Sequence, residues 1–100
     1  MIKVMFVCLG NICRSPMAEF VLKDLVKKRG IETEFYIESS ATSPEELGCD
    51  VHYGTVNKLN SLGIEVEHRS SKLLRKEDYE KFDYILGMEK RNILESILHI

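Results

Sequence analysis

The 100-residue sequence lacks the features that define several large classes of protein. Its three cysteines, Cys8, Cys13 and Cys49, do not show the paired spacing of a zinc site or a disulfide framework. Acidic and basic residues nearly balance, with a formal net charge of −2, so no nucleic-acid partner is predicted. No apolar run approaches the length that spans a membrane, and no membrane partner is predicted.

What remains is a chain with 44% hydrophobic residues, enough to bury one core. Its length predicts a single domain over residues 1–100. An odd number of cysteines without a framework favours the reducing cytoplasm. No motif indicates a metal or a cofactor, and we predict neither.

The order of elements predicts an α/β fold with a parallel sheet flanked by helices. Strands are expected at Ile2–Cys8, Glu34–Ser40 and Phe82–Met88. The first of these is rich in β-branched and apolar residues and is expected to be buried on both faces. Helices are expected after Arg14, around Val56 and Leu59 with an end at Gly63, at Glu77–Lys81 as a short turn, and from Glu89 onward. Residues 67–71 are expected to be irregular or a short extended piece.

The first helix carries the clearest boundary signals. Ser15 followed by Pro16 predicts an N-cap and a first helical residue, and Gly30 predicts the C-cap. Apolar residues at i, i+3, i+4 and i+7 predict the buried face, namely Ala18, Val21, Leu22 and Leu25.

The strongest functional signal is the segment Cys8–Ser15 (CLGNICRS). A buried strand brings Cys8 to the carboxyl edge of the sheet, where open α/β folds bind ligands. The following loop can turn its backbone N–H groups toward one anion, beside a helix N-terminus. Arg14 adds a guanidinium that matches two phosphate oxygens, and Ser15 can donate its hydroxyl to a Cys8 thiolate. Leu9, Gly10, Asn11, Ile12, Cys13 and Arg14 are the predicted phosphate-binding residues.

A simpler explanation is that Cys8 is a buried and unreactive cysteine, since cysteine is often buried. That explanation does not account for the combination of cysteine, glycine, arginine and serine at a strand-to-helix junction. We therefore predict that phosphate or another oxyanion binds in this loop and that Cys8 is the nucleophile.

The same segment resembles a known family. Val7–Glu19 (VCLGNICRSPMAE) closely resembles the signature of the low-molecular-weight protein tyrosine phosphatases. Glu38–Ser43 (ESSATS) and Phe82–Leu86 (FDYIL) resemble the second and third strands of that family, and Met88–Asn92 is similar to the segment that follows. The resemblance therefore covers essentially the whole chain.

The resemblance implies a phosphatase that hydrolyses phosphomonoesters, protein phosphotyrosine among them, through a phosphocysteine intermediate. It assigns the attack to Cys8 and the binding of the equatorial oxygens to Arg14. Ser15 and a hydrogen-bond network of Asn11, Ser39 and His68 would support the loop. It also implies a reversible disulfide between Cys8 and Cys13 that protects the nucleophile.

Two departures from the family pattern bear on activity. The family uses the aspartate of a late Asp-Pro motif as general acid, whereas the prolines here are Pro16 and Pro44 and neither follows an aspartate. The last strand and helix of the family are also missing, so three strands in the order 2-1-3 and a C-terminally truncated domain are expected. Glu45 stands about where family members place an aromatic residue against the substrate ring, which weakens the expectation of an aryl substrate.

Two other functions remain open. A homologue without the general acid could bind anions with impaired catalysis. An arsenate reductase of the same fold is less favoured, because that chemistry needs further cysteines after the third strand and residues 88–100 contain none.

The expected truncation also makes a prediction about association. Without a fourth strand, the third strand becomes an edge whose unpaired backbone groups and apolar side chains can pair with another chain. We therefore predict self-association, through the exposed sheet edge or through apolar contact between the uncovered faces, or else low stability as a monomer.

Overall fold

The computed structural model of this chain describes residues 1–8, 14–43, 48–68 and 70–87. Within these ranges the elements are β1 (Ile2–Cys8), α1 (Arg14–Lys28), a 3-10 turn (Glu32–Glu34), β2 (Phe35–Ala41), α2 (Tyr53–Ser61), α3 (Asp78–Lys81) and β3 (Tyr84–Gly87). The predicted third helix, from Glu89 onward, and the predicted strand end at Met88 lie outside the described residues. None of the helices in these ranges is long and apolar enough to cross a membrane.

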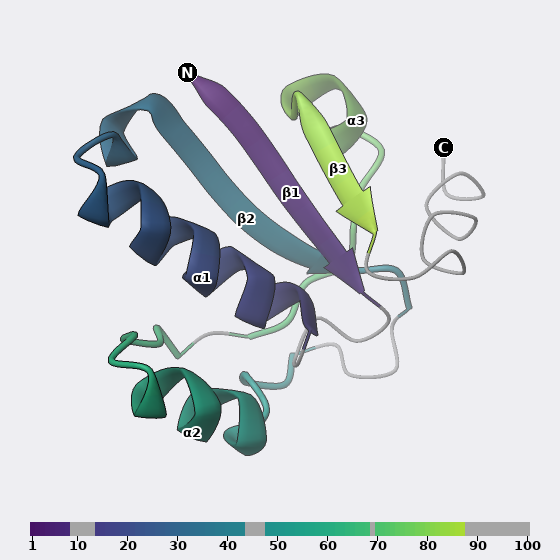
Figure 1. Cartoon of the computed structure of the whole chain (residues 1–100). Helices are drawn as coiled ribbons and strands as arrows, with labels where there is room; N and C mark the ends of the chain where they lie inside the picture. Colours follow the sequence, from purple (N-terminus) through teal and green to yellow (C-terminus); the bar gives the residue numbers. More distant parts are fainter. Residues whose placement is uncertain (9–13, 44–47, 69, 88–100) are drawn as a thin grey trace.

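The strands form a parallel three-stranded sheet in the order β2-β1-β3, which confirms the predicted fold class and strand order. Cys8 at the end of β1 pairs in register with Ala41 at the end of β2. Figure 1 shows the arrowheads of these two strands next to the first turn of α1. The topology therefore places the end of β1 and the start of α1 at one edge of the sheet.

The sheet separates two apolar clusters. On one face Met5 and Val7 of β1 pack with Leu74 and Phe82. On the other side α1 packs against β1, β2 and α2, and Phe20 joins a cluster between the two helices. Figure 1 shows α1 running alongside β1 and β2 with α2 beyond it. Central residues of β1 are thus buried on both faces, as its apolar sequence predicts.

The predicted start of the first helix is wrong, because the helix begins before the predicted N-cap. α1 begins at Arg14, so Ser15 lies inside the first turn instead of capping it, and its hydroxyl contacts Cys8. Pro16 is tolerated there because the first-turn N–H groups have no partner within the helix. The end is as predicted: Gly30 has φ 69°, and Ile31 N–H donates to the Val26 carbonyl in a closing turn.

The predicted buried face of α1 is also wrong. Val21 and Leu25 are 42% and 45% exposed. The face that meets the sheet instead carries Ser15, Glu19 and Val26. The prediction is wrong because polar side chains, Ser15 and Glu19, lie on the face that meets the sheet, where apolar side chains are expected. Within the described residues no element covers the Val21 side of the helix.

The remaining boundaries differ from prediction by one or two residues. β2 starts at Phe35 because the Glu34 N–H is used by the 3-10 turn, where it donates to the Ile31 carbonyl. β3 starts at Tyr84 because the Phe82 N–H closes α3. The structure confirms the second helix and its end at Gly63. It also confirms a short helical turn at 78–81 and, as far as it is described, an irregular segment around 67–71.

Candidate active site

The core of the site is a contact between Cys8 and Ser15. The Ser15 hydroxyl oxygen lies 2.9 Å from the Cys8 Sγ, and the Ser15 backbone N–H donates to the same sulfur over 3.4 Å. Both side chains are buried, with Ser15 at 0% and Cys8 at 4% exposure. A sulfur that accepts a hydrogen bond from a backbone N–H at a helix N-terminus is in an environment that favours negative charge.

Local structure explains why these two side chains meet. The parallel register ends β1 beside Ala41, and the Thr42 N–H donates to the Cys8 carbonyl over 3.0 Å, which fixes the last residue of the strand. α1 begins at Arg14, so the N–H groups of its first turn face the strand end. Arg14 itself is exposed at the start of this helix, where a guanidinium can reach an anion in front of the sulfur.

The predicted phosphate-binding residues between β1 and α1 are not described by the structure. Leu9, Gly10, Asn11, Ile12 and Cys13 lie outside the described residues, as does Glu45. Their roles stay predictions. The described residues on both sides bring Cys8, Arg14 and Ser15 to one end of the sheet.

The predicted supporting network is only partly represented. Ser39 is fully buried, and its hydroxyl donates to the Glu19 carboxylate over 2.6 Å. His68 is 69% exposed and its Nδ1 lies 2.7 Å from the Asp50 carboxylate. The structure therefore does not bring His68 to Ser39, and whether Asn11 links to either is outside the described residues.

Glu19 is a site residue that sequence reasoning did not single out. Its side chain has no solvent exposure, and Lys23 Nζ lies 2.5 Å from its second oxygen. A charged residue in a helix is usually solvated, so its burial could not be read from the sequence alone. The spacing was a usable signal, because Ser15, Glu19 and Lys23 recur at i, i+4 and i+8 on one face.

A second polar group lies on β2 farther from Cys8. The Tyr36 hydroxyl donates to Glu38 over 2.6 Å, and Lys72 Nζ donates to the same carboxylate over 2.9 Å. Burial raises the pKa of Glu38, but the hydrogen bonds from Lys72 and Tyr36 outweigh it and leave the pKa below its ordinary value. The hydrogen bond to Glu38, together with burial, raises the pKa of Tyr36.

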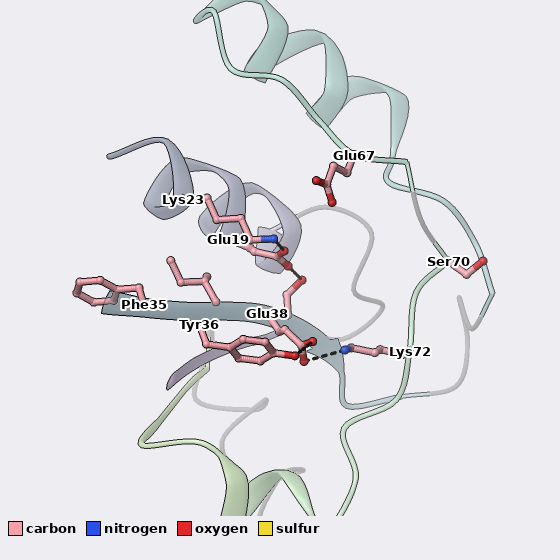
Figure 2. Close-up of a pocket in the computed structure, with 10 residues that line it drawn as sticks. Glu19, Lys23, Phe35, Tyr36, Glu38, Glu67, Ser70 and Lys72 are labelled. Atoms are coloured by element: carbon pink, nitrogen blue, oxygen red, sulfur yellow. Dashed lines mark hydrogen bonds and ion pairs between the residues drawn. The ribbon is translucent and has the colours of Figure 1, made fainter. Parts of the chain in front are cut away.

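A cavity of about 540 Å³ opens between α1 and β2. Figure 2 shows Glu19 and Lys23 along its helix side and Tyr36, Glu38 and Lys72 across from them. Cys8 and Ser15 do not line this cavity, so it is separate from the sulfur. Among the described residues no group of histidines, cysteines and carboxylates is arranged to hold a metal ion.

The described geometry fits nucleophilic chemistry at sulfur. Cys8 has a hydroxyl and a backbone N–H to stabilise its anion, a helix N-terminus beside it and an arginine at the first helical position. This arrangement suits attack on a tetrahedral oxyanion, with the helix end and Arg14 attracting the negative charge.

Sequence and structure comparisons agree on the family. A family model described as low molecular weight phosphotyrosine protein phosphatase matches residues 3–99. The chain belongs to this family.

Individual relatives are similar along nearly all of the chain. The low molecular weight protein-tyrosine-phosphatase YfkJ of Bacillus subtilis is 41% identical over 93% of the chain, and the crystal structure of YfkJ superposes on 99% of it with a TM-score of 0.94. The low molecular weight phosphotyrosine protein phosphatase of Rattus norvegicus is 43% identical over 90% of the chain. The chain spans 60% and 56% of the length of these two curated relatives, and 62% of the chain in the YfkJ structure.

Proposed function

We propose that this protein hydrolyses phosphomonoesters, protein phosphotyrosine among them, through a phosphocysteine intermediate on Cys8. The observation that carries the proposal is the buried Cys8 sulfur, with the Ser15 hydroxyl at 2.9 Å and a helix N-terminus beside it. Family membership supports the same activity.

The reaction proceeds in two displacements. The Cys8 thiolate attacks phosphorus, the bond from phosphorus to the ester oxygen breaks, and the leaving alkoxide or phenoxide takes up a proton from solvent. Water then attacks the phosphocysteine, the S–P bond breaks, and inorganic phosphate leaves with Cys8 restored as thiolate. Arg14 and the loop N–H groups hold the equatorial oxygens, while Ser15 stabilises the departing sulfur in the second step.

An anion-binding homologue with impaired catalysis is the alternative function, and an arsenate reductase is the less favoured one. Hydrolysis of para-nitrophenyl phosphate tests the nucleophile, because nitrophenolate leaves with little need for a proton. We expect it to proceed, and to exceed hydrolysis of an alkyl phosphate by roughly 10²–10⁴-fold if no general acid acts. Binding of phosphate without turnover of para-nitrophenyl phosphate would favour the anion-binding alternative, and thiol-dependent arsenate reduction would favour the reductase.

Oxidation is proposed to regulate the site in the cytoplasm. Cys8 is a free cysteine in the structure, and Cys13, five residues along, is the partner for a reversible disulfide. Peroxide should inactivate the protein and dithiothreitol should restore it, with a Cys8–Cys13 peptide detected by mass spectrometry. Oxidation that dithiothreitol does not reverse would argue against the disulfide.

Self-association through β3 with a second copy is proposed as well. Among the strands that the structure describes, β3 is an outer one, and Tyr84 and Leu86 are 57% and 44% exposed. Sedimentation velocity should show association that Leu86→Lys weakens, because charge on an edge strand opposes pairing. Val21→Lys is the matched control, since Val21 is 42% exposed on α1. A wild-type monomer across the concentration range would contradict the proposal, and a larger effect of Val21→Lys would move the contact to the helix side.

A further inference from the structure

Glu19 is a carboxylate held where an apolar residue would ordinarily lie. It is on α1, between the helix and the sheet, with no solvent exposure of its side chain. Removing a carboxylate from water is unfavourable unless close partners replace the lost hydration. Two such partners are present, the Ser39 hydroxyl at 2.6 Å and Lys23 Nζ at 2.5 Å. The first connects the helix to β2, and the second balances the charge from the next turn of the same helix.

This contact lies one helical turn from the contact made by Ser15. Residues four apart share a face of a helix, so Ser15 and Glu19 both point toward the sheet. Ser15 contacts Cys8 on β1, and Glu19 contacts Ser39 on β2. The same face of α1 is therefore fastened to two neighbouring strands at two successive turns. A helix held at one point can rotate or slide, whereas two hydrogen-bonded points fix both movements.

We infer that Glu19 is a positioning residue for the Cys8 chemistry. Its hydrogen bond with Ser39 holds the first turn of α1 in register with the end of β1, so that the Ser15 hydroxyl and the Ser15 N–H stay within hydrogen-bonding distance of the sulfur. Glu19 touches neither the sulfur nor the substrate in this account and acts through Ser15. The inference rests on the proposed phosphatase function.

A purely structural role for Glu19 makes a different prediction. If the buried carboxylate served only stability, Glu19→Leu would lower the stability, because it removes one partner of a buried ion pair, but the protein that still folds would keep its chemistry intact. Positioning by the Ser39 hydrogen bond instead predicts a folded protein with a misplaced Ser15. The two roles are separated by a pair of variants that both remove the charge but differ in the ability to accept that hydrogen bond.

The variants are Glu19→Leu and Glu19→Gln. Leucine removes the acceptor and glutamine keeps a carbonyl for the Ser39 hydroxyl. Because both delete the same negative charge, any long-range electrostatic effect on Cys8 is common to them. Asp24→Asn is the matched control: Asp24 pairs with Lys28 at 2.8 Å with the same i, i+4 spacing on the same helix, and Lys28 is 69% exposed. This control should leave the activity unchanged.

The readouts are kcat and KM on para-nitrophenyl phosphate and the pH profile of Cys8 alkylation by iodoacetate, each on protein shown to unfold cooperatively. We expect Glu19→Leu to lower kcat about tenfold or more, with a smaller change in KM, because tenfold corresponds to one lost hydrogen-bonding interaction of ordinary strength. Cys8 should also be alkylated more slowly in the same variant. For Glu19→Gln, kcat should remain within about threefold of wild type. A threefold change corresponds to less than half of the activation free energy of a tenfold change.

If Glu19→Leu and Glu19→Gln behave alike, or if Glu19→Leu keeps the wild-type kcat and alkylation profile, the positioning role is wrong. If Glu19→Leu does not fold, Ser39→Ala and Ser39→Thr test the same hydrogen bond from β2, with the threonine variant expected to retain activity. Failure of the proposed function has a separate signature: wild-type Cys8 would be alkylated no faster than Cys49, and phosphate would not protect it.

Discussion

The two flanks of β1 are built differently. On the β2 side, buried polar side chains connect helix and sheet: Ser15, Glu19 and Ser39 are all inaccessible to solvent. On the β3 side, Tyr84 and Leu86 are large, apolar and substantially exposed. Burying hydroxyl and carboxylate groups is unfavourable unless each has a partner, so a flank that retains them is constrained in its geometry. We infer from this comparison that the chemistry depends on the β2 flank, whereas the β3 flank carries the surface proposed for association.

The largest effect on activity is expected for Cys8, where β1 ends beside β2. Cys8→Ser should lower kcat on para-nitrophenyl phosphate by roughly 10⁴-fold or more, because loss of a covalent nucleophile leaves only binding and positioning. Steady-state kinetics measures it, with Cys49→Ser as the control for an exposed cysteine. Activity that survives Cys8→Ser would place the nucleophile elsewhere.

Ser15→Ala should have the next largest effect. It removes the hydroxyl at 2.9 Å from the sulfur but keeps the backbone N–H at 3.4 Å. We expect kcat to fall by roughly 10–100-fold, since a hydrogen bond to a charged group contributes about 1.5–3 kcal/mol. Burst kinetics should show slower breakdown of the phosphocysteine. An unchanged kcat with a lower melting temperature would mean that Ser15 only packs.

Truncations on the two faces of the sheet sharpen the contrast in stability. Met5→Ala should lower the free energy of unfolding by about 2–5 kcal/mol, because Met5 is fully buried and a cavity would remain. Leu86→Ala, at 44% exposure, should lower it by about 1 kcal/mol or less. Urea denaturation of both variants checks this. Equal losses would mean that the β3 side chains are covered in solution.

The smallest effect concerns pH and the group around Glu38. The folded-state pKa of Glu38 lies below its model-peptide value of 4.5, so its contribution to stability is present above that pH and is lost as pH falls through the folded value. Glu38→Gln should therefore weaken the decline of the melting temperature between about pH 5 and pH 3. Calorimetry at several pH values measures it. An unchanged decline would assign the acid sensitivity to other carboxylates.

The sequence predicts the apolar flank better than the polar one. The run Ile2–Cys8 and the glycines at positions 30 and 63 carry local signals, and the strand and the helix ends follow from them. The strand order is implied by the family resemblance. The buried face of α1 does not follow, because Glu19 reads as a solvated residue until β2 brings Ser39 against it. Contacts between distant segments decide which polar residues are buried.

The residues of the candidate site also differ in how well the sequence predicts their positions. Cys8, Arg14 and Ser15 could be predicted because a strand, a loop and a helix start are adjacent in the chain. His68 could not be placed from its sequence, since its contact with Asp50 depends on how the exposed loops meet. The Glu19–Ser39 contact joins residues twenty positions apart and is visible only once the helix packs on the sheet.

The most direct test of the central claim is alkylation of the wild-type protein by iodoacetate near neutral pH, followed residue by residue with mass spectrometry. Cys8 is buried at the helix N-terminus and Cys49 is exposed, so access alone would favour Cys49. The account predicts the reverse order, with Cys8 modified first and protected by inorganic phosphate or vanadate, because the Ser15 hydroxyl, the Ser15 N–H and the helix N-terminus lie beside the Cys8 sulfur. Faster labelling of Cys49, with Cys8 unaffected by phosphate, would contradict it.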